Sequence, residues 1–244
     1  MLGIEGYDGG ITDQGVVYAW FGSATGLGPS GTPANADWSA TGVQEGARLG
    51  WAGDGVGDLN GDGSDDVAVG AYTYDNPEVS EGSVFVWCGS PDGLGPSGTP
   101  ANADGRAESN VAGAALGYSL GPGGDVNADG YADLLVGAYG YPAESGGEAL
   151  PGAGAWFVWL GAPAGLGDPG IPANADLAGY GDQANGYLGR DDVAAGDVDG
   201  DGYSDILAAA NHYDLGETDE GVVFGYYSPF QQVFLPLIVR NHDE

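Results

Sequence analysis

Three copies of a nine-residue segment place oxygen-bearing side chains at regular intervals along the chain. The copies begin at Asp58, Asp125 and Asp197 and share the pattern D-x-[DN]-x-D-G-x-x-D. If the backbone curls, the oxygens at positions 1, 3, 5 and 9 converge, and the glycine at position 6 permits the sharp bend. Clustered carboxylates repel one another strongly when no cation lies between them. Such a ring of oxygens suits a hard cation with about six to eight oxygen ligands, which indicates calcium.

The predicted ligands occupy positions 1, 3, 5, 7 and 9 of each copy, so we expect three calcium ions. They are Asp58, Asn60, Asp62, Ser64 and Asp66; Asp125, Asn127, Asp129, Tyr131 and Asp133; and Asp197, Asp199, Asp201, Tyr203 and Asp205. The alternative is an Asp- and Gly-rich β-turn without metal. Such a turn needs no aspartate at positions 1, 5 and 9, so the pattern favours calcium.

The residues after each copy distinguish it from a helix–loop–helix calcium loop. That loop requires a glutamate at position 12, where this chain has Val69, Val136 and Ala208. Short apolar runs follow each copy and are typical of buried strands. These runs are 67–71, 134–138 and 206–210. The aspartate at position 9 must therefore supply the closing carboxylate.

The metal-binding segments belong to a longer internal repeat. Trp20, Trp87 and Trp159 are 67 and 72 residues apart, which are also the intervals between the three metal-binding segments. The segment Pro-Ala-Asn-Ala-Asp recurs at the same intervals. Its copies are 33–37, 100–104 and 172–176. The five extra residues of the longer unit are expected in the Gly-, Pro- and Glu-rich stretch 140–153.

Each repeat unit can be divided into four short strands, which predicts an all-β protein built from the antiparallel blades of a β-propeller. No segment has a helical period, and Gly or Pro interrupts the chain frequently. The first strands are expected to start at the Leu-Gly pairs 49–50, 116–117 and 188–189, and the second strands at 67–71, 134–138 and 206–210. The third strands are expected at 16–21, 83–88, 155–160 and 222–227, and the fourth near 38–41, 105–109 and 177–180.

The run from Leu116 to Tyr139 combines a Leu-Gly start, a metal-binding segment and a Gly-Ala-Tyr end. In this order, with Gly-Ala-Tyr in place of Gly-Ala-Pro, it resembles an FG-GAP repeat, and the resemblance covers residues 1 to about 228. These repeats build the propellers of integrin α-subunits and of many secreted bacterial proteins. The resemblance therefore implies an integrin α-like, calcium-binding propeller of a secreted bacterial protein, with partners docking on the face opposite the calcium loops. The third copy departs from the pattern at Ala209 and at Tyr226.

The repeat predicts a propeller segment over 1–228, followed by a tail over 229–244. Its blades are expected at about 1–47, 48–114, 115–186 and 187–228, with two full blades and a partial blade at each end. The last blade is expected to lack its fourth strand. Integrin-type propellers have about seven blades, so the chain is expected to be a C-terminal piece of a longer propeller. A closed four-bladed ring is the alternative.

The tail has two interpretations. It is similar to the endings of some secreted bacterial proteins, or it is an edge strand that completes the last blade. Pro236 would restrict such a strand to an edge, because proline cannot donate to a neighbouring strand.

Composition restricts the partners of the chain. Its 244 residues include 36 Asp and Glu but only 4 Lys and Arg, which gives a formal net charge of −32. A strongly acidic surface argues against binding to nucleic acid or anionic membranes. A hydrophobic content of 42% is too high for a disordered acidic chain. The sequence as given shows no signal-peptide pattern and no apolar run long enough to span a bilayer.

The sequence contains no recognisable catalytic constellation. It lacks G-x-S-x-G, H-E-x-x-H and phosphate-loop motifs, and His212 and His242 lie in a loop and in the tail. Cys88 has no second cysteine to pair with and occupies the repeat position of Phe21 and Leu160, so a core role is expected. These observations predict a protein that is not an enzyme.

The leading hypothesis is a calcium-stabilised propeller that serves as an adhesion or protein-interaction scaffold, with a structural role for the metal. Extracellular calcium modules bind at about 10⁻⁴–10⁻³ M, which favours an extracellular or cell-surface location. Loops 72–81, 139–153 and 211–220 are candidates for binding a protein or glycan. Their candidate residues are Tyr72, Tyr74, Asp75, Tyr139, Tyr141, His212 and Tyr213, although each tyrosine could instead pack between blades.

A second hypothesis is the propeller part of a calcium-dependent carbohydrate-active or phosphodiester-cleaving enzyme, because some FG-GAP-like propellers accompany such enzymes.

Overall fold

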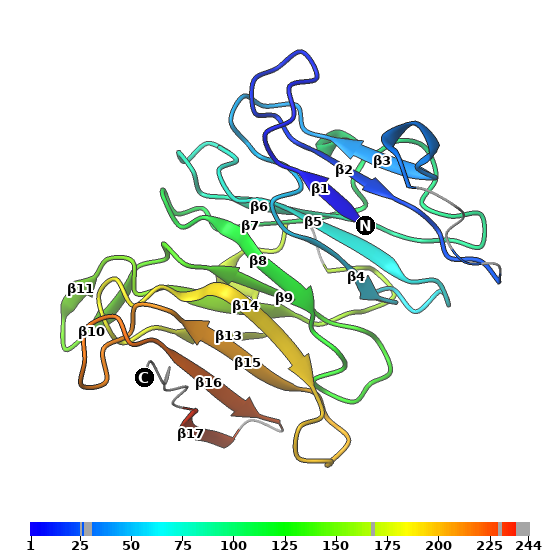
Figure 1. The fold of residues 1–244 in the computed structure, drawn as a ribbon. Helices are drawn as coiled ribbons and strands as arrows, with labels where there is room; N and C mark the ends of the chain where they lie inside the picture. Colours follow the sequence, from blue (N-terminus) through cyan, green and yellow to red (C-terminus); the bar gives the residue numbers. More distant parts are fainter. Residues whose placement is uncertain (25, 27–30, 167–168, 229–230, 238–244) are drawn as a thin grey trace, which may run out of the picture.

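The computed structural model describes residues 1–24, 26, 31–166, 169–228 and 231–237. They form four consecutive antiparallel β-sheets, which we number blades 1 to 4, and one small hairpin (Figure 1). The described part is therefore all-β and has the arrangement expected for a partial propeller of FG-GAP type. No helix in this part has the length and apolar composition needed to cross a membrane.

The strands follow the predicted repeat closely. Blade 1 contains β1 (Leu2–Ile4), β2 (Val16–Ala19) and β3 (Trp38–Thr41), and blade 2 contains β4 (Gly53–Gly57), β5 (Asp66–Ala71), β6 (Ser83–Trp87) and β7 (Gly105–Glu108). Blade 3 contains β8 (Leu116–Pro122), β9 (Leu134–Ala138), β12 (Ala155–Trp159) and β13 (Leu177–Tyr180). Blade 4 contains β14 (Leu188–Gly196), β15 (Asp205–Ala210), β16 (Val222–Tyr227) and β17 (Gln231–Leu237).

The first strand of blade 2 starts later than expected, at Gly53 instead of Leu49. The reason is that Leu49 pairs with the preceding blade, where its N–H donates to the carbonyl oxygen of Gln14 at 3.2 Å. In blades 3 and 4 the first strand does begin at the Leu-Gly pair, but its pairing register shifts a few residues later. The Leu-Gly pair therefore contributes mainly to the contact with the preceding blade and less to the pairing of the first strand within its own blade.

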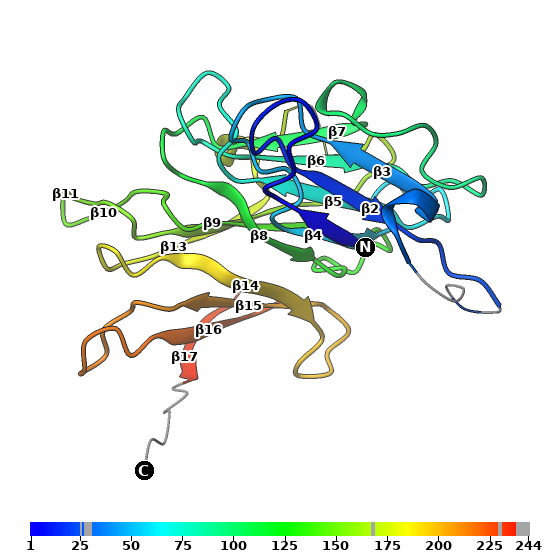
Figure 2. The same cartoon turned by 45° about the horizontal axis from the view of Figure 1, so that its top comes forward.

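Blade 4 differs from the expectation that its fourth strand is missing. The strand β17 pairs with β16 from Gln231 to Leu237 and lies at the outer edge of the sheet. The interpretation of the tail as an edge strand is therefore the one observed up to Leu237, whereas residues 238–244 lie outside the described part. The blades form an open arc with blades 1 and 4 at opposite ends, not a closed four-bladed ring (Figure 2).

The hydrophobic core lies between neighbouring blades, because alternate residues of each strand face opposite sides of its sheet. In β9, Leu134 and Val136 pack against residues of blade 2, whereas Leu135 packs against residues of blade 4. A third cluster joins blades 1 and 2 around Val17 and Phe85. Each blade is thus stabilised mainly by its neighbours.

Paired glycines bring the inner strands of adjacent blades together. A Cβ atom on Gly137 would lie closer than 3.0 Å to the carbonyl oxygen of Gly189, and one on Gly70 would meet Gly117 in the same way. Gly117 and Gly189 also have positive φ angles of 83° and 76°, a conformation that glycine adopts without steric strain. This contact explains why both the Leu-Gly pair and the glycine of the second strand recur in the repeat.

The Pro-Ala-Asn-Ala-Asp segments form the outer turns of blades 1 to 3. Each contains a short 3₁₀ turn: η1 (Pro33–Asn35), η2 (Pro100–Asn102) and η3 (Pro172–Asn174). In blade 2, the side-chain oxygen of Asn102 accepts hydrogen bonds from the Trp87 indole at 3.3 Å and from the Thr99 N–H at 2.6 Å. Asp104 accepts the N–H of Cys88 at 2.8 Å. The spacing between the tryptophan and this segment, which recurs in blades 1 to 3, is therefore structural.

Cys88 is half-buried, whereas a core position was expected. Burial raises the pKa of its thiol to about 11, and the nearby carboxylates of Asp66 and Asp104 act in the same direction. The thiol is therefore protonated and poorly nucleophilic at neutral pH.

Candidate metal centre

The three predicted metal-binding segments connect the first and second strands of blades 2, 3 and 4. We call them loop 1 (58–66), loop 2 (125–133) and loop 3 (197–205). The glycine at position 6 has nearly the same positive φ angle in all three loops. These angles are 91° at Gly63, 93° at Gly130 and 94° at Gly202. The three segments therefore share the bend that the sequence predicted.

The first aspartate of each loop folds the backbone around its own carboxylate. In loop 2, Asp125 accepts the N–H groups of Asp129 at 3.0 Å and Gly130 at 2.9 Å. Asp58 and Asp197 accept the equivalent pairs of N–H groups in loops 1 and 3. The loops are curled by these bonds, so the carboxylate of the first aspartate lies on the inside of the turn.

The last aspartate of each loop ties the loop to the end of the third strand. Asp133 is fully buried, and its two oxygens accept the N–H of Val126 at 2.8 Å and of Gly161 at 2.9 Å. Asp66 and Asp205 accept equivalent pairs: Leu59 with Gly89, and Val198 with Ser228. Each oxygen keeps a further lone pair that a cation can use.

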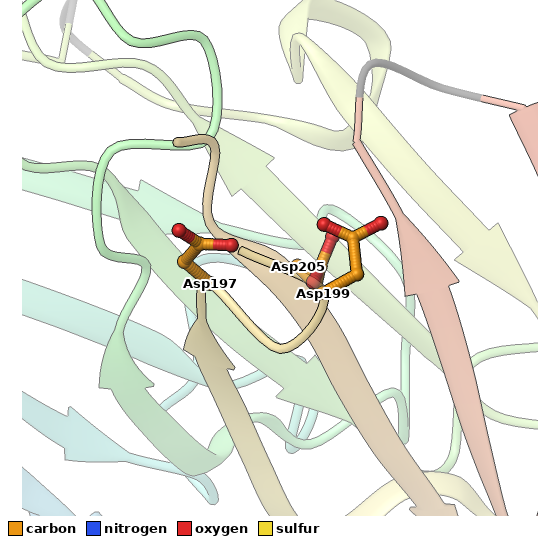
Figure 3. A group of neighbouring side chains, drawn as sticks. All are labelled: Asp197, Asp199 and Asp205. Atoms are coloured by element: carbon orange, nitrogen blue, oxygen red, sulfur yellow. The ribbon is translucent and has the colours of Figure 1, made fainter. Parts of the chain in front are cut away.

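Loop 3 brings its carboxylates closest together. Ligand oxygens of Asp197, Asp199 and Asp205 lie within 4.8 Å of one another, the one such group of three His, Cys, Asp or Glu residues in the described part (Figure 3). In loops 1 and 2, position 3 is an asparagine whose amide donates to the aspartate at position 5. The donor set is all oxygen, which fits a hard cation such as calcium.

The residues at position 7 do not all direct their side chains toward their own loop. The ring of Tyr131 lies against Gly61 of loop 1, so closely that a Cβ atom on Gly61 would overlap it. Its N–H donates to Asp129 at 3.0 Å, as the N–H groups of Ser64 and Tyr203 do to the aspartates at position 5. The main chain of Tyr131 is therefore the part available to loop 2.

Burial makes the closing carboxylates costly to ionise. The pKa of Asp133 is raised to about 6, mainly by burial and to a smaller extent by the charges of Asp125 and Asp129, whereas its two backbone hydrogen bonds act in the opposite direction. The pKa of Asp66 is also raised, again mainly by burial. A bound cation would favour the ionised forms and offset this effect.

The raised pKa of Asp133 predicts an unusual pH dependence for the metal-free protein. The folded pKa of about 6 lies above the unfolded value of 3.8, so this group stabilises the fold fully below pH ~4. That stabilisation is lost as the pH rises through about 6, by about 3 kcal/mol in all. Urea unfolding in EDTA between pH 4.5 and 7.5 should show a steeper loss for the native chain than for Asp133→Asn. Parallel curves for the two chains would contradict the assignment.

Adjacent loops are hydrogen-bonded to each other through the same positions. The N–H of Ala132 in loop 2 donates to the carbonyl oxygen of Asp58 in loop 1 at 3.0 Å. The N–H of Ser204 in loop 3 donates to the carbonyl oxygen of Asp125 in loop 2, also at 3.0 Å. The first residue of a loop, a predicted metal ligand, is therefore held by the loop of the next blade.

The predicted binding residues on the opposite face are largely used in packing. Tyr74, Tyr141 and Tyr213 pack on the third-strand rings Phe85, Phe157 and Phe224, with ring centroids 5.2–5.4 Å apart. Asp75 accepts the N–H of Ser80 at 2.6 Å and so shapes its own loop. These residues support the blades, as the alternative interpretation for the tyrosines predicts.

Tyr72, Tyr139 and His212 belong to a continuous aromatic band that sequence reasoning did not find. The band runs across blades 2 to 4 and consists of Trp51, Tyr72, Tyr118, Tyr139, Tyr187 and His212, with successive ring centroids 4.6–5.8 Å apart. Arg190 lies over three of its tyrosines, and Arg48 donates to the Tyr72 hydroxyl at 2.8 Å. The signal in the sequence was the residue directly after each Leu-Gly pair: Trp51, Tyr118 and Arg190.

Comparison with known proteins identifies the repeat. The FG-GAP repeat family matches residues 50–87, 116–155 and 191–226. Integrin alpha-IIb of Mus musculus is 39% identical over 100 residues, which cover 41% of this chain and 9% of the relative. Phosphatidylinositol-glycan-specific phospholipase D of Homo sapiens is 32% identical over 189 residues, which cover 75% of this chain and 21% of the relative. The chain thus spans about a tenth to a fifth of the length of these relatives.

Proposed function

Because the chain is an FG-GAP repeat protein similar to integrin alpha chains, we propose that it is a calcium-binding, extracellular propeller module that serves as an adhesion or protein-interaction scaffold. The observation that carries the proposal is the shared architecture of the three loops. Each curls around its first aspartate and fastens its last, buried aspartate to the third strand of the blade. Ions in these loops would neutralise carboxylates that otherwise repel within the fold.

The role of the metal in this proposal is structural. The loops precede the second strands of the blades, whereas the aromatic band includes residues that follow those strands, such as Tyr72 and Tyr139. Metal and band therefore lie at opposite ends of the same strands, too far apart for a bound ion to contact a partner on the band. Calcium would act by holding the blades in place.

The aromatic band is the surface that we assign to a protein or glycan partner. Trp51 is 37% exposed, and the band combines ring faces with two of the four basic side chains of an otherwise acidic chain. Aromatic and arginine side chains are enriched at binding hot spots because they bury a large area with few rotatable bonds. The rings, from the exposed Trp51 and the buried Tyr72 to the half-buried rings beyond them, are packed against one another, so the surface is pre-organised.

Calcium titration followed by NMR is the direct test of the proposal. The amide signals of Gly63, Gly130 and Gly202 report on loops 1, 2 and 3 separately, because each amide is bonded to the first aspartate of its loop. All three signals should shift with millimolar calcium and return in EDTA. Unchanged signals at all three glycines would refute calcium binding.

The hydrogen bonds between adjacent loops predict that the sites are coupled. Replacing the first ligand of loop 2, Asp125→Ala, should weaken calcium binding at loops 1 and 3 by about fivefold or more, the lower range of typical site coupling. Asp197→Ala should act directly on loop 2 and only weakly on loop 1, because no hydrogen bond joins loops 1 and 3 among those described. Loops that titrate with unchanged affinity in the Asp125→Ala chain would exclude the coupling.

A second candidate function follows from the phospholipase D relatives, which align with three quarters of the chain. In this alternative the chain is the propeller part of a calcium-dependent, phosphodiester-cleaving or carbohydrate-active enzyme. The chain as given should then show no hydrolysis of glycosylated phosphatidylinositol or of glycans by itself, but should bind such a substrate in calcium. Binding of proteins without binding of these substrates favours the scaffold instead.

A further inference from the structure

Buried polar atoms without hydrogen-bond partners are concentrated at one place in blade 2. Eight buried side-chain nitrogen and oxygen atoms in the described part have no partner, and five of them belong to four neighbouring residues. They are Glu78 Oε2, Glu81 Oε1, Glu81 Oε2, Ser83 Oγ and Arg106 Nε. Four of these five atoms are oxygens. We call these residues, together with Glu108, the Glu81 cluster.

The Glu81 cluster lies at the end of blade 2 that is remote from loop 1. Glu78 and Glu81 belong to the connection after β5, Ser83 begins β6, and Glu108 ends β7 directly opposite Ser83 in the strand register. Glu81 and Ser83 are fully buried, and Glu108 is 5% exposed. The cluster is therefore separate from the three calcium loops.

The cluster holds more negative charge than its single cation can neutralise. Arg106 Nη2 lies 3.2 Å from Glu108 Oε2, which also accepts the Asn76 amide at 2.7 Å. Glu81 has no such partner. The pKa of Glu81 is raised to about 7, first by burial and then by the charges of Glu108 and Glu78, whereas the N–H groups of Asn110 and Asn76 act in the opposite direction. Three carboxylates and one guanidinium leave an excess of two negative charges when all are ionised.

The fold does not need acidic residues at these positions. The N–H of the next Leu-Gly leucine donates to the backbone oxygen of Gln14 in blade 1, of Glu81 in blade 2 and of Ala153 in blade 3, so the three residues are equivalent. All three are buried. The same backbone hydrogen bond therefore forms whether the side chain is the amide of Gln14, the carboxyl group of Glu81 or the methyl group of Ala153. The position opposite Ser83, Glu108, corresponds likewise to Thr41 and Tyr180.

We propose that Glu78, Glu81 and Glu108, together with the Ser83 hydroxyl, form a further site for a hard divalent cation in blade 2. A cation with about six to eight oxygen ligands can take several of the unpartnered oxygens at once, whereas one proton can link only two of them. Two positive charges also match the charge excess. The carboxylate oxygens of the three glutamates do not all lie within 4.8 Å of one another, unlike those of Asp197, Asp199 and Asp205, so the glutamate side chains must move closer together to bind the cation. The same holds for the aspartates of loops 1 and 2.

The test counts calcium ions bound to the full chain by equilibrium dialysis. Glu81→Gln introduces the side chain that blade 1 carries at this position, so the variant is expected to fold, and it should bind one ion fewer than the native chain. The matched control, Gln14→Glu, puts a carboxylate at the equivalent position of blade 1, where Glu78 and Glu108 have no acidic counterparts, and should leave the count unchanged. Equal counts for the native and Glu81→Gln chains would overturn the proposal.

Two further measurements separate the cation from a proton and from the calcium loops. A crystal of the full chain soaked in terbium should show an anomalous peak between Glu81 and Glu108, and no peak there contradicts the proposal. If Glu81→Gln leaves the ion count unchanged but abolishes a pH dependence of the metal-free melting temperature around pH 7, the cluster holds a proton and the cation site is excluded. The NMR signals of Gly63, Gly130 and Gly202 should respond to calcium in the variant as in the native chain.

Discussion

Removing calcium with EDTA is expected to lower the melting temperature of the chain by about 10 °C. If each loop is at ten times its dissociation constant, binding contributes about 1.4 kcal/mol per loop and about 4 kcal/mol for the three. A domain of this size shifts by about 2–4 °C for each kcal/mol. The effect is large because a folded domain is stabilised by only about 5–15 kcal/mol in total.

The measurement is calorimetry in millimolar calcium and then in excess EDTA, with calcium restored at the end. A matched control is the chain with Asp58, Asp125 and Asp197 all replaced by Asn, which removes one carboxylate ligand from each loop. Its melting temperature in calcium should lie near that of the native chain in EDTA. Identical melting curves of the native chain with and without EDTA would show that the loops do not use calcium for stability.

Replacing one inner-strand glycine is expected to be nearly as damaging as losing all the calcium. In Gly137→Ala, the added methyl group would overlap the backbone oxygen of Gly189 and the hydroxyl of Ser119, which are themselves hydrogen-bonded at 2.7 Å. Backbone atoms cannot rotate away, so blades 3 and 4 must separate slightly. Overpacking of this kind typically costs about 1–3 kcal/mol, and we expect the upper end.

The control for this substitution is Gly216→Ala, in an exposed part of blade 4 where an added Cβ meets nothing within 4 Å. It should change the free energy of unfolding by less than about 0.5 kcal/mol. Urea denaturation of both variants in calcium gives the comparison. Equal stabilities of the two variants would mean that the close approach of Gly137 to Gly189 is not required.

The bends of loops 1 to 3 and the strands beside them were predictable because their signals are local. Nine residues contain both the bend at Gly130 and the predicted ligands, and the apolar run after Asp133 is confirmed as the second strand β9. The third strands were equally clear from alternating aromatic residues around Trp87 and Trp159. In each case the residues that decide the structure are adjacent in sequence.

Contacts between blades could not be predicted, because they depend on how one sheet is placed on the next. Nothing in the sequence near Asp58 indicates that its carbonyl accepts the N–H of Ala132, more than 70 residues later. The same is true of Tyr118, which joins the aromatic band only after blades 2 and 3 have packed. Glu81 lies in the loop 72–81, for which the sequence indicated only Tyr72, Tyr74 and Asp75 as binding residues.

The tail shows where a local rule was informative but incomplete. Pro236 cannot donate a backbone hydrogen bond, and β17 indeed lies at the edge of blade 4, where only one neighbour is present. The rule indicated which position a strand could take. It could not indicate whether the strand forms, because that depends on pairing with β16.

The five-residue insertion of blade 3 closes on itself. Within the stretch 140–153, β10 (Ala143–Ser145) pairs with β11 (Glu148–Leu150) across Gly146 and Gly147, both with positive φ angles. Two such residues are typical of tight hairpin turns that match the twist of their strands. The parent sheet keeps its register, because β9 and β12 remain paired from Ala138 to Leu134. The tip of this hairpin is thus a natural place to graft a foreign peptide, because an insertion there would leave the pairing of β9 with β12 in blade 3 unchanged.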